Sequence, residues 1–483
     1  MPGHAVPLLA CVLLLLHSPP ASASTWTEQQ QLAASDAASG DYFGTVSISG
    51  DYAVIGAPFD DSIQGSAYIF YRSGSSWTQQ AKLVAGDGAA NDYFGNSVSM
   101  SGDTVVIGAA SKDSTSPSLS NSGSAYVFVR SGTSWTQEAQ LVASDAADDD
   151  KFGTSVAISG DYIIVGAFVD DDNGSASGSA YVFMRTGTTW SEQAKLTASD
   201  GVAVDRFGIS VSISGEYVVV GAYGHSSSPT PGKAYVFMRS GTNWSEQAKL
   251  TASDGANGDN FGYSVSISGS YAVVGAEHDD TEQGSAYVFE RTGSTWSQMQ
   301  KLTASDAATN VDFGQSVSIS GSSIIIGAPA HDGPSTLTNA DYGRAYIFVS
   351  DGTTWTEQQK IVSNDNGQYD WFGWSVAISS DDALVGARFD DYDPGSGSIV
   401  NSGSAYVFTR PASPPPSTSP GPSTSPSPPP NTSPSPPPST LPSPPPSTSP
   451  GPSTPPTATS GTHNRRFQAL SLTALAVCVT ILV

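Results

Sequence analysis

The sequence predicts an all-β fold, a seven-bladed β-propeller of four-stranded blades whose N-terminal strand completes the last blade, followed by a disordered proline-rich stalk. Three observations predict this fold: one unit recurs seven times, each unit holds four short apolar runs bounded by turn residues, and the two ends of the repeat region complement each other. Nothing in the repeat region has helical periodicity. Four antiparallel strands repeated at a period of about 55 residues are typical of propeller blades.

The repeated unit is recognised by four motifs. A Phe-Gly pair opens each unit, and a Val-x-Ile/Met-Ser segment follows it. An apolar run ending in Gly-Ala, an Ala-Tyr-Val/Ile-Phe run and a Trp-x-x-x-x-x-Leu/Ile run supply the remaining strands. The Phe-Gly pairs begin at Phe43, Phe94, Phe152, Phe207, Phe261, Phe313 and Phe372.

The phase of the repeat predicts a closed ring. An unpaired Trp-type run, 26–32, precedes the first unit, whereas the last unit ends at its Ala-Tyr-Val-Phe run, 405–408, with no Trp run after it. Pairing the first run with the last would complete the seventh blade and remove an open sheet edge. The propeller is therefore expected to span residues 24–410.

The chain ends carry targeting patterns. Residues 1–23 contain a ten-residue apolar core followed by Ala21-Ser22-Ala23, which predicts a secretory signal peptide. Residues 411–459 hold most of the 33 prolines and no charge, so a polyproline stalk is expected, and its units resemble hydroxyproline-rich cell-wall glycoproteins. Residues 460–483 join small residues to an apolar tail, which indicates a glycolipid-anchor signal, with a single membrane span as the alternative.

The repeat motifs resemble the FG-GAP repeats of the integrin α-subunit N-terminal propeller. The resemblance covers the whole repeat region, and all seven copies carry both Phe-Gly and Gly-Ala. It implies an extracellular propeller in which Phe and Trp fill the spaces between blades. It also implies cations in Asp-rich loops between strands one and two. In this chain those connections are tight turns such as Gly50-Asp51, which offer too few oxygens for Ca²⁺, so that calcium site is expected to be absent.

Acidic residues concentrate elsewhere, in the loops that join strand two to three and strand four to the next strand one. Strand parity puts these loops on one face. Two Asp bracket most four-to-one loops, and they fit either of two roles: turn caps that accept backbone N–H groups, or ligands of Ca²⁺. Clustered carboxylates favour the cation role. The candidate metal ligands are Asp145, Asp150, Asp170, Asp171, Asp172, Asp390 and Asp391.

Aromatic residues gather where the innermost strands of the propeller are expected to begin. Blade seven reads Tyr-Asp-Trp-Phe-Gly-Trp over 369–374, the densest aromatic cluster of the chain. Exposed aromatic rings beside a carboxylate suit stacking on a sugar, while the alternative is that Trp371 and Trp374 fill gaps between loops. The candidate ligand-binding residues are Tyr263, Asp370, Trp371 and Trp374.

Composition excludes several functions. With 44 acids against 19 bases and a net charge of −25, the chain lacks the basic clusters that nucleic acids require. Both cysteines lie in the terminal apolar runs, and no Ser/His/Asp set or zinc-type cluster is evident, so no catalytic residue is predicted. Asn-x-Ser/Thr sequons predict N-glycosylation at Asn173, Asn243 and Asn431.

The function expected from these features is a secreted, surface-tethered, non-enzymatic module for adhesion or recognition. Its partner is expected to be an extracellular glycan or protein bound by the acidic loop face, and the C-terminal anchor is expected to hold it on the membrane at the cell surface or cell wall. The alternatives are a strict carbohydrate-binding lectin and a surface hydrolase, since propellers support both binding and catalysis.

Overall fold

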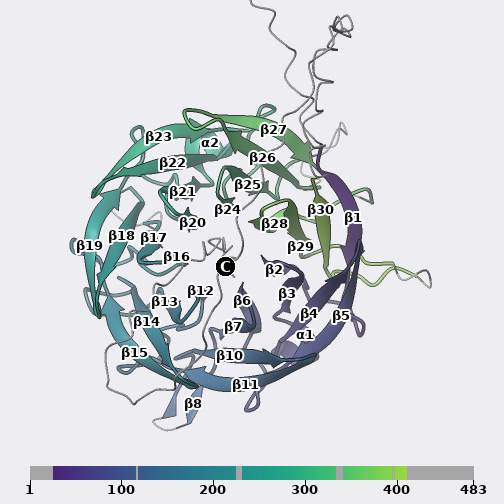
Figure 1. The fold of residues 1–483 in the computed structure, drawn as a ribbon, viewed down its shortest axis with the longest axis horizontal. Coiled ribbons are helices and arrows are strands. Elements are labelled where there is room, and N and C mark those ends of the chain that lie inside the picture. The colour runs from purple at the N-terminus through teal and green to yellow at the C-terminus, as the bar shows by residue number, and fades with distance from the viewer. Residues whose placement is uncertain are drawn as a thin grey trace, which may run out of the picture. The chain divides into compact units, whose positions relative to one another are not determined.

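The computed structural model describes residues 25–115, 118–224, 231–332, 341–365, 367–393, 395 and 397–410. The predicted signal peptide, stalk and anchor signal and the sequon at Asn431 lie outside the described residues. Within them the fold is the predicted seven-bladed propeller of four-stranded antiparallel sheets (Figure 1). Among the helices in this part of the chain, none is long and apolar enough to cross a membrane.

The first four blades follow one another along the chain. Their strands are β2 (Thr45–Ser49), β3 (Tyr52–Ala57), β4 (Ser66–Ser73) and β5 (Ser76–Leu83) in blade one; β6 (Phe94–Ser101), β7 (Thr104–Ala109), β10 (Ser124–Ser131) and β11 (Ser134–Leu141) in blade two; β12 (Ser155–Ser159), β13 (Tyr162–Ala167), β14 (Ser179–Thr186) and β15 (Thr189–Leu196) in blade three; and β16 (Ser210–Ser214), β17 (Tyr217–Ala222), β18 (Lys233–Ser240) and β19 (Asn243–Leu250) in blade four.

The remaining blades complete the ring. Their strands are β20 (Val265–Ser268), β21 (Tyr271–Ala276), β22 (Ser285–Thr292) and β23 (Thr295–Leu302) in blade five; β24 (Ser316–Ser320), β25 (Ser323–Ala328), β26 (Arg344–Ser350) and β27 (Trp355–Ile361) in blade six; and β28 (Phe372–Ser379), β29 (Asp382–Ala387), β30 (Ser404–Thr409) and β1 (Thr27–Leu32) in blade seven. The two-to-three loops add the four-residue turns α1 (Asp60–Ile63) and α2 (Asp279–Glu282) and a small hairpin of β8 (Ser114–Thr115) and β9 (Ser118–Leu119).

The closure predicted from the two ends of the repeat region is confirmed. Strand β1 pairs antiparallel with β30, with Gln31 opposite Tyr406, and the two strands lie side by side at the rim of the ring (Figure 1). Trp26 and Leu32 expose only 2% of their surface each. The N-terminal strand therefore contributes core as well as hydrogen bonds to blade seven.

Close contact between blades explains the Gly-Ala motif. A Cβ on Gly56 would lie 2.0 Å from the carbonyl oxygen of Gly95 in the next Phe-Gly pair, and one on Gly386 would lie 1.9 Å from that of Gly44. No side chain fits at such a distance, so only glycine lets the backbones of neighbouring blades touch. The Gly386–Gly44 contact joins blade seven to blade one, so the same packing runs around the whole ring.

Buried serines and aromatic rings hold neighbouring blades together. Ser97 Oγ donates to the carbonyl of Gly153 at 2.8 Å, and Ser47 Oγ accepts from the N–H of Met100 at 3.2 Å. These bonds satisfy polar groups that the packing removes from water. Each Phe of Phe-Gly is buried edge-on against two aromatic rings of its blade; Phe43 meets Tyr68 at 5.6 Å between ring centroids. The packing role expected for these rings is confirmed.

Tight turns join strand one to strand two, as expected. In blade one Ser49 pairs with Tyr52 across Gly50-Asp51, and in blade three Ser159 pairs with Tyr162. The long loops that could supply cation ligands between these strands are therefore replaced by two-residue turns. The acidic residues of functional interest lie at the other end of the strands.

Candidate functional site at the mouth of the ring

The two-to-three and four-to-one loops of each blade lie together, as strand parity predicted. The N–H of Phe59 donates to the carbonyl of Asp41 at 3.3 Å, and the N–H of Phe389 donates to that of Asp370 at 3.3 Å. The four-to-one loop leads into the innermost strand of the next blade, and the innermost strands surround the centre of the ring (Figure 1). One end of the ring is therefore built from loops of all seven blades.

Three positions of the repeat differ from blade to blade and meet at this end, which we call the mouth. They are the residue before Phe-Gly, the residue after it, and the residue after Gly-Ala. In blade order these residues are Tyr42, Tyr93, Lys151, Arg206, Asn260, Asp312 and Trp371; Thr45, Asn96, Thr154, Ile209, Tyr263, Gln315 and Trp374; and Pro58, Ala110, Phe168, Tyr223, Glu277, Pro329 and Arg388.

The residue before Phe-Gly adopts a left-handed backbone in every blade, with φ between 55 and 60°. For a residue other than glycine this conformation costs roughly 1 kcal/mol or more. Because all seven blades share it, the conformation belongs to the fold, whereas the side chain that it presents is Tyr, Lys, Arg, Asn, Asp or Trp. A repeated backbone thus carries a varied set of side chains to one place, as a binding surface requires.

The mouth contains two cavities. A cavity of about 440 Å³ lies between blades five, six, seven and one, and a second of about 260 Å³ lies between blades one, two and three. Both volumes lie near the lower end of the range typical of small-molecule sites. The smaller cavity is lined by Phe59, Tyr93, Asn96, Lys151 and Phe168 among others.

The larger cavity contains three of the four predicted ligand-binding residues. Tyr263, Trp371 and Trp374 line it, but the expectation of an exposed aromatic platform is wrong, since Tyr263 and Trp374 each expose only 6% of their surface. The two tryptophan rings lie 5.4 Å apart and tilted by 34°. Trp374 packs against Arg388 as well as Trp371, and Trp371 also packs against Phe389. The two tryptophan rings form part of the wall of the larger cavity. This role differs both from an exposed platform for stacking and from the filling of a gap between loops.

Asp370, the fourth predicted ligand-binding residue, is not among the residues that line the larger cavity. Its carboxylate accepts a hydrogen bond from the N–H of Gly367, and it exposes 5% of its surface. Burial raises its pKa to about 7, with Asp390 contributing. The equivalent Asp150 accepts from the N–H of Ala147 at 2.6 Å. The second Asp of the bracketing pair is therefore a turn cap, which was one of the two predicted roles.

Sequence reasoning missed the polar groups of the larger cavity. Arg388, Glu277, Asp312 and Gln315 line it together with the aromatic rings. Burial raises the pKa of Glu277 to about 8, with Asp312 adding to the effect, and burial raises the pKa of Asp312 to about 6. The signal that would have found Arg388 and Glu277 is the residue after Gly-Ala, which is variable in an otherwise repeated segment.

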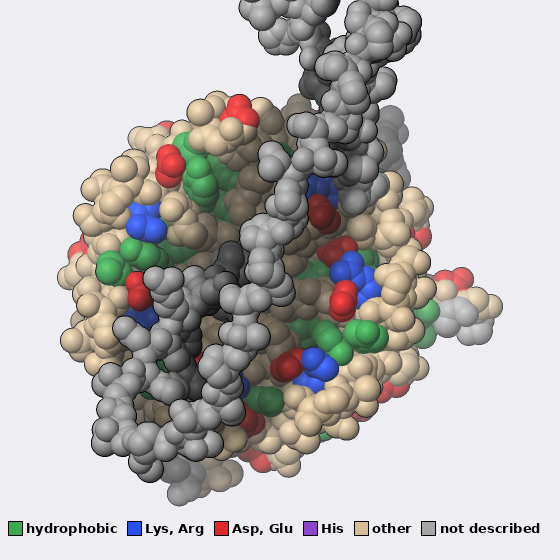
Figure 2. Space-filling view, viewed as in Figure 1, with side chains coloured by type: hydrophobic (Ala, Val, Ile, Leu, Met, Phe, Trp, Pro, Cys, Tyr) green, Lys and Arg blue, Asp and Glu red, His purple; other side chains and the backbone are tan. Residues whose placement is uncertain are grey.

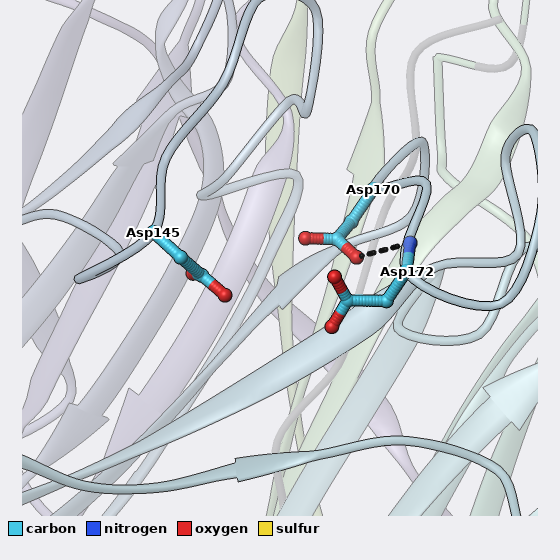
Figure 3. A group of neighbouring side chains, drawn as sticks. All are labelled: Asp145, Asp170 and Asp172. Atoms are coloured by element: carbon cyan, nitrogen blue, oxygen red, sulfur yellow. Dashed lines mark hydrogen bonds between the residues drawn. The ribbon is translucent and has the colours of Figure 1, made fainter.

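The candidate metal ligands of blade three have different roles in the structure. Asp145, Asp170 and Asp172 place carboxylate oxygens within 4.8 Å of one another, close enough to hold a metal ion (Figure 3). Asp171 points away and accepts from the N–H of Ala176 at 2.8 Å, while Asp150 caps its turn. The sequence therefore identified the right pair of loops, but only three of their carboxylates converge.

A lysine from the outer strand pairs with this triad. Lys195 Nζ lies 2.7 Å from Asp145, 3.0 Å from Asp170 and 2.5 Å from Asp172. The phenol of Tyr181 donates to Asp145 and Asp170. The ammonium thus supplies the positive charge that clustered carboxylates require, and a metal ion fits this set only if Lys195 moves away.

The same arrangement recurs around the ring. Lys82 and Lys301 each pair with three Asp, Lys112 pairs with Asp87 and Asp92, Lys233 and Lys249 pair with Asp200, and Arg344 and Lys360 pair with Asp306. In Figure 2 basic side chains accordingly lie beside acidic ones at several places around the ring. Blades one to six thus place one or two basic side chains beside their loop acids, which offsets only part of the negative charge.

Blade seven differs from the other blades in the residues that contact its loop carboxylates. Gln31 stands where five other blades have lysine, and its Nε2 donates to Asp390 at 3.2 Å and lies 3.1 Å from Tyr406 OH. In the described part of the chain, no Lys, Arg or His forms an ion pair with Asp365, Asp370 or Asp390. Burial raises the pKa of Asp390 to about 6, and Asp365 and Asp391 add to the effect. Asp391 itself accepts from the N–H of Asn401 at 2.7 Å.

The seven four-stranded sheets arranged in a ring define a seven-bladed β-propeller whose mouth carries variable side chains. A model of the FG-GAP repeat family matches seven segments of the chain, 26–70, 77–128, 135–183, 190–237, 244–289, 296–348 and 355–408. The chain therefore belongs to the FG-GAP repeat family, as its motifs indicated. No curated protein matches its sequence significantly.

Proposed function

We propose that this protein is a secreted, surface-tethered, non-enzymatic binding module that recognises an extracellular glycan or protein through the mouth of its propeller. The FG-GAP propeller fold fits a binding or adhesion module. The observation that supports the proposal most directly is the mouth itself. Fourteen of its twenty-one variable residues line two cavities, whereas the blade interiors repeat nearly the same residues.

A carbohydrate ligand is favoured over a purely protein ligand by the larger cavity. Tyr42, Phe59, Phe389, Trp371 and Trp374 form a continuous series of aromatic contacts with centroids 4.6–5.4 Å apart. Aromatic faces stack on the apolar face of a sugar ring, and the neighbouring carboxyl and amide groups accept hydroxyl protons. This observation keeps the strict lectin as the second candidate.

Secretion and tethering rest on the sequence patterns at the two ends. The signal-peptide pattern of residues 1–23 supports export, and the small residues and apolar tail of 460–483 support a glycolipid anchor. Treating intact cells with a phosphatidylinositol-specific phospholipase should release the anchored protein, from which the apolar tail has been removed. Retention, with a mass that includes residues 467–483, would identify a membrane span instead.

The binding test uses the released protein on arrays of extracellular glycans and matrix proteins. Saturable binding should fall at least about tenfold in Trp371→Ala, because this half-buried ring lines the cavity. The matched control is Trp135→Ala, a half-buried tryptophan of the outer strand β11, which should bind as the wild type does. Equal binding by both variants removes the mouth from the proposal, and turnover of a polysaccharide or phosphate ester would establish a hydrolase.

The calcium ligands that we propose are Asp145, Asp170 and Asp172, because among the described residues their carboxylate oxygens converge, and Lys195 has to leave them for the ion to bind. Millimolar Ca²⁺ should then raise the melting temperature relative to chelator at matched ionic strength, and Mg²⁺ should raise it less. Asp172→Asn should abolish the shift, whereas Asp390→Asn should preserve it. Equal melting temperatures in Ca²⁺ and chelator exclude a calcium role and leave ligand binding at the mouth untouched.

A further inference from the structure

The larger cavity of the mouth has a cationic wall made by one buried arginine. Arg388 follows Gly-Ala in blade seven and exposes 7% of its surface. Its guanidinium carbon lies 4.5 Å from the ring centroid of Trp374, 5.1 Å from that of Phe389 and 5.2 Å from that of Tyr42. The guanidinium is therefore packed among aromatic faces.

This arginine has no anionic partner among the residues that the structure describes. Of the acidic residues that the structure describes, none forms an ion pair with Arg388, and none of its side-chain N–H groups donates a hydrogen bond within the described chain. The other buried or half-buried basic side chains at this end mostly pair with carboxylates, as Lys112 does with Asp92 at 3.2 Å. Burial lowers the pKa of Arg388 to about 10, so it remains charged at neutral pH. A buried charge with unused donors calls for an anion from outside.

The opposite wall is polar and acidic. Glu277 and Asp312 line it with Gln315, and Asn260 Nδ2 donates to Glu277 Oε1 at 3.2 Å. With its raised pKa, Glu277 is largely protonated at neutral pH, and it can both donate and accept hydrogen bonds. These groups suit hydroxyls and are unfavourable for a second negative charge on the ligand.

From this two-sided cavity we infer that the propeller binds a carboxylate-bearing sugar, a uronic acid residue, with its carboxylate on Arg388, its ring against Trp374 and its hydroxyls on Gln315, Asp312 and Glu277. This inference rests on the proposed function and names the ligand class of the same mouth. Guanidinium and carboxylate match as planar forks, which gives two parallel hydrogen bonds.

A planar monoanion fits better than a sulfate or phosphate group. A carboxylate is planar, as the guanidinium of Arg388 is, and it carries a single negative charge. A phosphate dianion would bring additional charge toward Asp312 and toward a protein whose net charge is −25. The chemistry of the two walls therefore favours one negative charge together with several hydroxyls.

The experiment measures binding of galacturonate and glucuronate oligosaccharides to the full-length protein by calorimetry, with tryptophan fluorescence as a second readout. Neutral galactose and glucose oligosaccharides of equal length serve as comparison ligands. The wild type should bind the uronates at least about tenfold more tightly. Arg388→Gln should remove that preference, while Arg239→Gln, a matched charge loss at an exposed ion pair with Glu216, should retain it.

Each outcome decides the inference. Equal affinity for acidic and neutral sugars, or a preference that survives Arg388→Gln, overturns it while leaving the proposed glycan binding intact. Tighter binding of sulfated or phosphorylated sugars, or of a free α-amino acid, also overturns it. If Arg388→Gln fails to fold, Gln315→Leu should still weaken uronate binding at least about threefold. Absence of binding to every glycan and matrix protein removes the proposed function as well.

Discussion

The acidic clusters of blades three and seven occupy the same place in the repeat, but different side chains contact their carboxylates. In blade three Lys195 pairs with three carboxylates, and lysine and tyrosine hydrogen bonds lower the pKa of Asp145 despite its partial burial. In blade seven Gln31 replaces the lysine, and burial raises the pKa values of Asp370 and Asp390. The outer strand thus supplies an ammonium group to the carboxylates of blade three and an amide group to those of blade seven.

The comparison shows that blades one to six each supply a basic counterion to their own loop carboxylates. Where lysine is missing from the outer strand in blade two, at Gln140, Lys112 of the two-to-three loop pairs with the acids instead. Only blade seven, whose outer strand comes from the other end of the chain, lacks such a residue among those described. We therefore expect the stability of blade seven to depend most on pH.

The largest effect should come from breaking the closure itself. Trp26→Ala removes a buried indole beside β1 and should cost about 3–5 kcal/mol of unfolding free energy. Deleting residues 25–33 should lower stability further, because it exposes the edge of β30. Thermal melting followed by circular dichroism measures both. If the deletion variant melts with the wild type, β1 does not complete blade seven in solution.

The next largest loss of stability should come from replacing the outer-strand lysine of blade three by glutamine, the residue that blade seven has. Lys195→Gln leaves Asp170, which is buried, and its two neighbours without a positive charge, and should cost about 2 kcal/mol at pH 7.5. Lys249→Gln is the matched control, since Lys249 is half-exposed and Lys233 remains beside Asp200; it should cost less than about 1 kcal/mol. Equal losses in urea unfolding would show that the lysines do not act as counterions for buried acids.

The pH dependence of the free energy of unfolding should reveal the raised pKa values of the carboxyl groups in blade seven. Their pKa values in the folded state, about 6 for Asp390 and about 7 for Asp370, lie above the ordinary value near 4. The folded state then binds more protons than the unfolded state, so stability falls as pH rises from about 4 to 7. Asp390→Asn should flatten this decline by about 2 kcal/mol, whereas Asp145→Asn should leave it unchanged. An unaltered slope in Asp390→Asn would contradict the assignment.

The smallest effect should come from giving blade seven the missing lysine. Gln31→Lys should stabilise the protein by about 1 kcal/mol at pH 7.5 and by less at pH 5, where Asp370 and Asp390 are protonated. The control is Gln140→Lys in blade two, where Lys112 already pairs with the acids, and no gain is expected there. A gain in the control equal to that in Gln31→Lys would indicate a general charge effect, since the net charge is −25.

The fold was predictable from sequence because its causes are local and repeated. Gly56 and Gly386, the buried Phe of each Phe-Gly pair and the run at 26–32 carry signals that seven copies reinforce, and the turn-cap role of Asp150 follows from its spacing within one loop. The candidate site was predictable only in outline. Trp371 and Trp374 were found as an aromatic cluster, but their burial and their partner were not.

What the sequence alone determined is the number of blades, the closure of the ring and the face on which the acids and variable residues lie. Only the tertiary structure decided which groups meet: Lys195 with an aspartate 50 residues earlier, and Arg388 with Tyr42 from the far end of the chain. The physical reason is that strand periodicity and turn chemistry act between neighbours in sequence. Charge pairing and cavity lining depend instead on distances between loops of different strands and blades, which exist only once the ring has closed.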